Sequence, residues 1–555
     1  MVCVHFFLVS LKANVQMVGN AVAKLSLNET LSKLPYAEGA GWDTDLGCLQ
    51  GTREALIDDI YNWARNTGPT AELYLLTAVA GAGKSAIAHT IDQQCADSGI
   101  LLTSFFFKRD VAGCDRPDKL LSTLVYCYGT ASMYDLAQID EEVSKYVASA
   151  VELDHSLPSA PLSRQFKELL MMSSRRMQTN RPLVIILDAL DEGASEALLR
   201  ILCDELNYLP GLFRIVVTSR PDERLVNLSI KEHVCSLEMD LEDTNNLADI
   251  EKYIKHQASI LAKAKMTVLE DTWLSGQLLA DVIQKAEGLF QWVSVVFSYL
   301  QTVRNPLKQL ENFLSNPTLS GADLEMKMDL TYTEILKKCN WKDSDFVDGY
   351  QLIIGAVIAL KRPLSKDALQ QLHGDTLPMQ ITDLVAPLSS ILPGIEDGQH
   401  SMLILHQSLC DFLILRTLDK PETCQFYLDE KEYSARLALM CLELVNRILP
   451  LNIVNLDYLS SDSITEEGIP DIAAELKSQL SEEALYACTH WIDHIRDVAI
   501  QSTRLTEAVE TFISQKMVYW MEIAGLLELN ASLKDIWTYI NVSARSYEIF
   551  VEMSE

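Results

Sequence analysis

A run of small residues that ends in a lysine and a hydroxyl is the strongest chemical signal in the sequence. It consists of Ala80, Gly81, Ala82, Gly83, Lys84 and Ser85. An apolar strand is expected before it, over residues 72–80, and a helical pattern follows it. Small residues let successive backbone N–H groups turn inward around a phosphate, Lys84 can reach the β- and γ-phosphates, and Ser85 can ligate Mg²⁺. The pattern predicts binding of ATP or GTP together with Mg²⁺.

One position departs from the usual phosphate-loop pattern. Ala78 stands where G-x-x-x-x-G-K-[ST] begins with glycine, so the start of the loop is less permissive and the affinity for nucleotide can be reduced. Taken alone, the run is also compatible with an ordinary strand-to-helix turn. A second motif about a hundred residues further along the chain favours phosphate binding.

This second motif is an apolar run over residues 183–187 that is followed by acidic side chains. A run this apolar is typical of a strand buried on both faces. We expect Asp188, at the end of the strand, to lie beside the phosphate loop and to hold Mg²⁺ directly or through a water molecule. Asp191 or Glu192 is then expected to orient the attacking water. The alternative is that the three acids only cap the next helix.

Three further apolar runs, over residues 101–107, 213–217 and 234–239, alternate with helical segments. This alternation predicts an α/β domain with a parallel sheet flanked by helices. Ligands bind such sheets at the carboxyl ends of the strands, and Arg220 stands at one of these ends. We expect its guanidinium to detect the γ-phosphate, although an arginine after a strand more often forms a surface ion pair.

Length and composition limit the classes of function. At about 150 residues per domain, 555 residues predict three to four domains. Lys plus Arg number 46 against 77 Asp plus Glu, and the resulting net charge of −31 disfavours binding to nucleic acid. The 12 cysteines are spread singly, which favours a reducing, cytoplasmic location. The apolar stretch over residues 2–11 is too short to span a membrane.

The motifs together resemble the NACHT family of signal-transducing NTPases, of the STAND class. The resemblance is strongest to fungal members related to heterokaryon-incompatibility and nephrocystin-type proteins. A small residue after Asp188, followed by the Asp-Glu pair, is similar to the family pattern, and so is the segment over residues 48–53. In the family this lead-in segment lies over the nucleotide base, which implies that Thr52 and Arg53 contact the nucleotide.

The resemblance also implies an order of domains. The fold expected is a P-loop NTPase domain followed by a helical lid, a winged helix and an all-α C-terminal region. The lid is expected to contain two amphipathic helices, over residues 241–262 and 278–300. The boundaries are 1–45 for an N-terminal segment interpreted as the remnant of an effector module, 46–240 for the NTPase, 241–329 for the lid, 330–418 for the winged helix and 419–555 for the C-terminal region.

The winged helix contributes one more candidate residue. We expect a hairpin that turns at residues 397–398 and a last strand over 402–405, directly before His406. In the resting state of related proteins a winged-helix histidine contacts the β-phosphate of a bound diphosphate. The resemblance implies this contact for His406, and a purely structural role is the alternative.

These features predict a nucleotide-operated signalling switch. A closed form would hold diphosphate, and an open form with triphosphate and Mg²⁺ would self-associate into a homo-oligomer, with slow hydrolysis as the reset. The helical C-terminal region is a candidate contact for a protein partner, and the sequence shows none of the repeats that often follow it in related proteins. The alternatives are a P-loop NTPase or kinase with constitutive turnover, and a truncated scaffold without catalysis.

Overall fold

The computed structural model divides the chain into two compact units, Met1–Ser294 and Val295–Glu555, which are described separately. The structure describes residues 37, 40–70, 72–109, 113–130, 141–177, 179–265, 273–315, 324–392, 402, 407–418, 420–449, 480–498 and 503–526. Most of them are helical, as the low glycine and proline content indicates.

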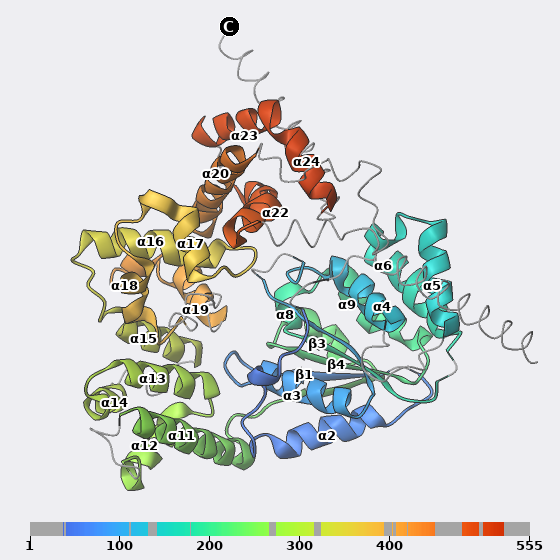
Figure 1. The fold of residues 1–555 in the computed structure, drawn as a ribbon. Helices are drawn as coiled ribbons and strands as arrows, with labels where there is room; N and C mark the ends of the chain where they lie inside the picture. Colours follow the sequence, from blue (N-terminus) through green and yellow to red (C-terminus); the bar gives the residue numbers. More distant parts are fainter. Residues whose placement is uncertain are drawn as a thin grey trace, which may run out of the picture. The chain divides into compact units, whose positions relative to one another are not determined.

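A five-stranded sheet forms the centre of the first unit (Figure 1). Its strands are β1 (Glu72–Thr77), β2 (Leu101–Phe106), β3 (Leu183–Asp188), β4 (Phe213–Ser219) and β5 (Val234–Glu238). They lie in the order β2-β3-β4-β1-β5, and each neighbouring pair is parallel. The predicted parallel sheet is therefore confirmed. Every residue of β3 and β4 is buried, as expected for strands covered on both faces.

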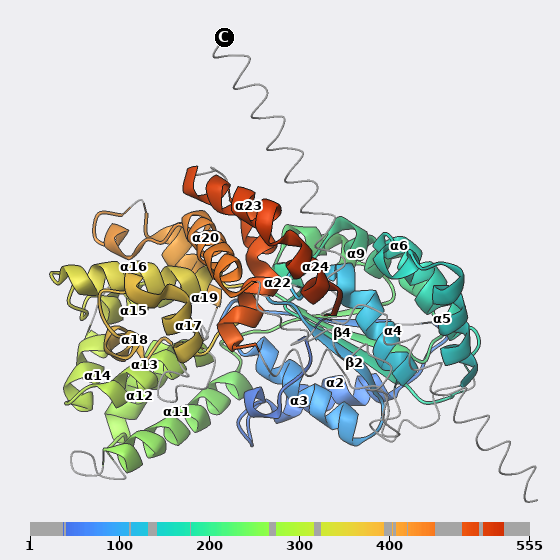
Figure 2. The same ribbon diagram turned by 45° about the horizontal axis from the view of Figure 1, so that its top comes forward.

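Side chains of successive strand residues enter two different cores. Tyr74 and Leu76 of β1 pack with helices α2 (Glu54–Arg65) and α3 (Lys84–Asp97) on one face. Leu73 and Leu75 point to the other core. The helices on that second face, some of which Figure 2 shows above the sheet, include α4 (Leu120–Thr130), α5 (Glu141–Leu153), α6 (Leu162–Gln165), the π-helical segment Phe166–Met171 and α9 (Glu196–Arg200).

Two helices of the expected lid belong to the first unit, and a third continues into the second. They are α11 (Thr244–Ala264), α12 (Gly276–Ala286) and α13 (Phe290–Thr302). The prediction of one continuous helix over residues 278–300 was wrong. The chain leaves the helical conformation at Glu287 and Gly288, with φ of 50° and 78°. Gly288 packs so closely that an added Cβ would lie 2.5 Å from the Leu241 carbonyl oxygen.

The described part of the second unit consists of helices. They are α14 (Pro306–Ser315), α15 (Leu324–Leu336), α16 (Ser344–Ala359), α17 (Lys366–His373), α18 (Ile381–Val385), α19 (Gln407–Asp411), α20 (Glu430–Ile448), α22 (Glu482–Asp497), α23 (Thr503–Gln515) and α24 (Met517–Leu526), besides shorter turns. Apart from residue 402, the hairpin and strand expected before His406 lie outside the described residues. Among the described helices, none combines the length and the apolar character that crossing a membrane requires.

Gly288→Ala is expected to lower the free energy of unfolding by about 2–5 kcal/mol, because alanine would carry both a strained φ and a Cβ contact that is too short. Gly99→Ala is the matched control: Gly99 also has a positive φ, of 68°, but open space around its Cα. In the control the free energy of unfolding should fall by only about 1 kcal/mol. Urea unfolding followed by circular dichroism measures both, and equal losses would contradict the packing argument.

Candidate functional site

The phosphate loop connects β1 to α3 through two residues in the left-handed region. Gly81 has φ of 82°, and Gly83, the residue that precedes the helix, has φ of 92°. Glycine adopts these angles without steric cost. Because Gly83 has no side chain that could cap α3, the first N–H groups of this 14-residue helix are left for another acceptor. A helix N-terminus of this kind favours an anion such as phosphate.

Lys84 folds back over the loop. Its Nζ donates hydrogen bonds to the carbonyl oxygens of Ala78 at 2.8 Å and Val79 at 3.1 Å. Burial lowers the pKa of Lys84, while the nearby carboxylates of Asp191 and Asp188 act in the opposite direction. The ammonium group is thus held at the loop, close to acidic side chains of two other segments.

Asp188 joins three elements at the carboxyl edge of the sheet. It is buried at the end of β3, and it accepts hydrogen bonds from the hydroxyls of Thr218 on β4 and Ser85 on α3. Burial raises the pKa of Asp188, and both hydrogen bonds oppose that shift. Thr218 also accepts the backbone N–H of Ala189 at 3.1 Å. No role was expected for Thr218, which lies two residues before Arg220.

Arg220 pairs with two of the three acids of the second motif, Asp191 and Glu192. Its backbone N–H donates to Asp191 Oδ1 at 2.9 Å, its Nε lies 3.3 Å from Asp191 Oδ2, and its Nη2 lies 3.9 Å from Glu192 Oε1. Burial, reinforced by the charge of Asp191, raises the pKa of Glu192 to about 7. The structure therefore brings Asp191, Glu192 and Arg220 into one cluster.

The lead-in segment reaches the same loop. Thr52 is buried, and its hydroxyl donates to the Leu49 carbonyl oxygen at 2.6 Å. Arg53 is buried as well, and its Nη2 donates to the Ala82 carbonyl oxygen at 2.9 Å. His406 lies outside the described residues, so its expected contact with a β-phosphate stays a prediction.

Gln291 of α13 contacts the loop, which the sequence analysis missed. Its backbone N–H donates to the Gly81 carbonyl oxygen at 3.2 Å. Its side chain lies against Gly81, where an added Cβ would be 2.6 Å from Gln291 Oε1. No local pattern in the sequence marks this glutamine, because the contact depends on how the lid helices fold back onto the sheet.

Residues 51–220 match the protein family described as "Nephrocystin 3, N-terminal". The matched range contains the phosphate loop, Asp188 and Arg220. A longer stretch of 369 residues is 23% identical to the vegetative incompatibility protein HET-E-1 of Podospora anserina. In these ranges the chain is similar to fungal-type NACHT NTPases of the STAND class. The HET-E-1 match covers 62% of this chain but only 25% of HET-E-1, so the chain spans about a quarter of that relative's length.

Solved structures give only loose matches to this chain. A structure of Drosophila ORC bound to DNA matches with a TM-score of 0.27 and 14% identity, over 63% of this chain and 90% of that one. The Aeropyrum pernix ORC1 protein in complex with DNA matches with a TM-score of 0.26 and 13% identity, over 66% and 93% of the two chains. At these scores the likeness supports no conclusion about this chain.

The candidate site residues fit a nucleotide with Mg²⁺. A hydroxyl and a carboxylate, from Ser85 and Asp188, supply the oxygen ligands that Mg²⁺ prefers. Because Asp188 is buried and its pKa is raised by burial, a divalent cation beside it would favour its ionised form. Lys84 and the N-terminus of α3 supply positive charge for phosphate.

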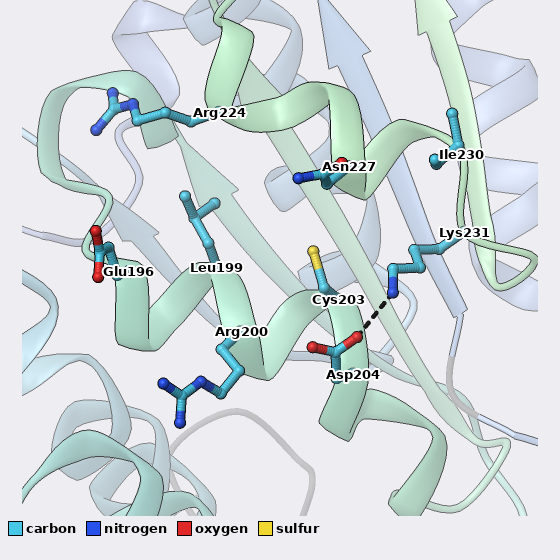
Figure 3. A pocket seen from close by; sticks show the side chains of 9 residues that line it. All are labelled: Glu196, Leu199, Arg200, Cys203, Asp204, Arg224, Asn227, Ile230 and Lys231. Carbon is cyan, nitrogen blue, oxygen red and sulfur yellow. Dashed lines mark hydrogen bonds and ion pairs between the residues drawn. The ribbon is translucent and has the colours of Figure 1, made fainter.

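A hollow of about 390 Å³ lies apart from these residues (Figure 3). It lies between α10 (Val226–Ser229) and α9 with the π-helical segment Ile201–Glu205 that follows it. Its lining is Glu196, Leu199, Arg200, Cys203, Asp204, Arg224, Asn227, Ile230 and Lys231. Lys231 and Asp204 pair across it at 2.7 Å. None of the expected site residues lines this hollow, so we do not assign the nucleotide to it.

Glu192→Gln is expected to change how the stability of the protein depends on pH. The folded protein holds the Glu192 proton up to a pH of about 7, whereas the unfolded chain releases it near pH 4.5. The stabilisation from this group is therefore full below about pH 4.5 and is lost as the pH rises to about 7. The free energy of unfolding of the variant minus that of the parent should therefore be about 1–3 kcal/mol larger at pH 8 than at pH 4.5.

Urea unfolding at several pH values measures this effect. Glu196→Gln, on the neighbouring helix α9, is the control for the loss of a single carboxylate. A constant difference between Glu192→Gln and the parent from pH 4.5 to pH 8 would contradict the assignment.

Proposed function

We propose that the chain is a cytoplasmic, nucleotide-operated signalling switch that binds ATP or GTP with Mg²⁺. The observation that carries this proposal is the hydrogen bonding of Asp188 to Ser85, at the start of the helix that follows the phosphate loop. Lys84 and Arg220 both lie close enough to Asp191 to interact with it electrostatically. These four side chains come from three separate strand ends, and together they suit a nucleoside triphosphate and its metal ion.

In this proposal the backbone from Ala80 to Ser85 holds the β-phosphate, and Lys84 reaches between the β- and γ-phosphates. Ser85 and Asp188 hold Mg²⁺, which when bound would neutralise charge on the phosphate oxygens. Thr52 and Arg53 lie on the base side of the nucleotide. The hydrogen bond from Arg53 to the Ala82 carbonyl oxygen of the loop supports that placement.

Arg220 is the residue proposed to tell triphosphate from diphosphate. Its ion pairs with Asp191 and Glu192 leave it partly satisfied, so a γ-phosphate must compete with these carboxylates for the guanidinium. Such competition gives the two nucleotides different affinities for the two states, which a switch requires. His406 is proposed to favour the diphosphate state, and the triphosphate form to self-associate, both on the basis of the family resemblance.

Asp191 and Glu192 are proposed to orient the attacking water. Their pairing with Arg220 supports slow hydrolysis, because carboxylates held by a cation activate water less well. The helical C-terminal region is the proposed contact for a protein partner. Under this proposal hydrolysis resets the switch rather than supplying product.

Lys84→Ala should weaken nucleotide binding about 10- to 100-fold, because it removes a charged donor to phosphate. Titration with a fluorescent ATP or GTP analogue measures the effect. Lys255→Ala is the control, since Lys255 is an exposed lysine of α11 paired with Glu251. Equal affinity of the Lys84 variant and the parent would overturn the proposed function.

Steady-state hydrolysis by the purified chain should be well below the 1–100 s⁻¹ that is typical of kinases. Phosphate release from saturating ATP or GTP with Mg²⁺ measures it. Turnover within the kinase range would instead favour a constitutive NTPase, because a switch must persist in its triphosphate form.

A further inference from the structure

Two lid helices hold the carbonyl groups of the phosphate loop. The Gly81 carbonyl oxygen accepts the backbone N–H of Gln291, from α13, at 3.2 Å. The next carbonyl, of Ala82, accepts Nη2 of Arg53 at 2.9 Å. Arg53 is itself held by α11, since its backbone N–H donates to Asp249 Oδ2 at 2.9 Å. Helix α13 therefore contacts the loop directly, and helix α11 contacts it through Arg53.

Holding these two carbonyl groups fixes two N–H groups as well. In a planar trans peptide the N–H points opposite to the C=O of the same unit. With the Gly81 oxygen bound to Gln291, the N–H of Ala82 faces the other way, and it donates a long hydrogen bond of 3.5 Å to the Val79 carbonyl oxygen. With the Ala82 oxygen bound to Arg53, the N–H of Gly83 also faces away from that oxygen. The N–H of Gly83 is thereby preorganised for an anion.

Arg53 needs outside support to remain in this position. It is a non-glycine residue with φ of 59°, a conformation that costs free energy unless its surroundings enforce it. Its side chain is buried, with the guanidinium carbon 4.8 Å from the centre of the Phe290 ring. Its N–H stands at the start of α2, where no residue of that helix can accept it. The carboxylate of Asp249 supplies that acceptor from 196 residues away.

Asp249 is also well held. It is buried, and its second oxygen lies 3.4 Å from the ammonium of Lys252, which donates to the Gly51 carbonyl oxygen at 2.6 Å. Two residues of α11, Asp249 and Lys252, therefore bind the lead-in segment at Arg53 and Gly51, directly before α2. This arrangement transmits the position of α11 to Arg53 and from there to the loop.

We propose that Asp249 is a positioning residue that governs how fast nucleotide leaves the phosphate loop. It acts by keeping Arg53 on the Ala82 carbonyl group, and Gln291 acts in parallel on Gly81. The lid thereby controls the loop through hydrogen bonds to its outer carbonyl groups. This inference rests on the proposed function, and it adds the element through which nucleotide exchange is regulated.

The test is the dissociation rate of N-methylanthraniloyl ADP, or of the GDP analogue, measured by stopped-flow displacement from the full chain. Asp249→Ala should speed dissociation about tenfold or more, the effect expected for loss of a hydrogen bond to a charged group. Asp249→Asn, which keeps an acceptor oxygen, should give a smaller increase. Glu251→Ala, which removes an exposed carboxylate of the same helix, should stay within about twofold of the parent.

A double-mutant cycle separates positioning from general loss of stability. If Asp249 acts through Arg53, adding Asp249→Ala to Arg53→Ala should leave the dissociation rate nearly unchanged. Should Asp249→Ala fail to fold, Asp249→Asn carries the test. A rate for the Asp249 variants equal to that of Glu251→Ala would overturn the inference and leave nucleotide binding intact. Failure of the parent chain to bind either analogue would overturn the proposed function as well.

Discussion

The buried carboxylate of Asp188 needs hydrogen-bond partners, and it finds them where three strands end. A buried carboxylate without partners would be strongly unfavourable. Ser85 and Thr218 meet that need from α3 and β4. This works only because β4 lies between β1 and β3 in the sheet, which sets Thr218 beside Asp188. The carboxylate of Asp188 is the point around which the phosphate loop, the acidic cluster and Arg220 lie.

Because the whole chain is strongly acidic, binding of phosphate depends on the positive groups of the site itself. A net charge of −31 repels a phosphate ligand, so the site must supply its own attraction. The N-terminus of α3, Lys84 and Arg220 do so within a few residues of strand ends. Arg220 is the most constrained of these, because it also neutralises Asp191 and Glu192. A ligand that draws Arg220 away changes the charge balance of the whole cluster.

Local sequence patterns were sufficient to predict the parallel sheet, the glycine loop and the acids after β3, because each is encoded in a continuous run of residues. These patterns did not predict where the helix breaks or which long-range contacts form. The run over residues 278–300 is helical by periodicity, but the close approach of Gly288 to Leu241 ends the helix. Asp249 and Arg53 meet across 196 residues, and no local pattern encodes that pairing. Nor could the sequence show that Arg220 pairs with the acids in the structure described here.

The central claim is that the loop from Ala80 to Ser85 holds a nucleotide, and its identification in the purified protein tests that claim most directly. Protein prepared without added ligand would be denatured, and the released small molecules analysed by mass spectrometry. The account predicts an adenine or guanine nucleotide in roughly stoichiometric amount, mainly as the diphosphate, because slow hydrolysis and slow release retain it. Protein free of nucleotide that also binds none when ATP or GTP is supplied with Mg²⁺ would contradict the account.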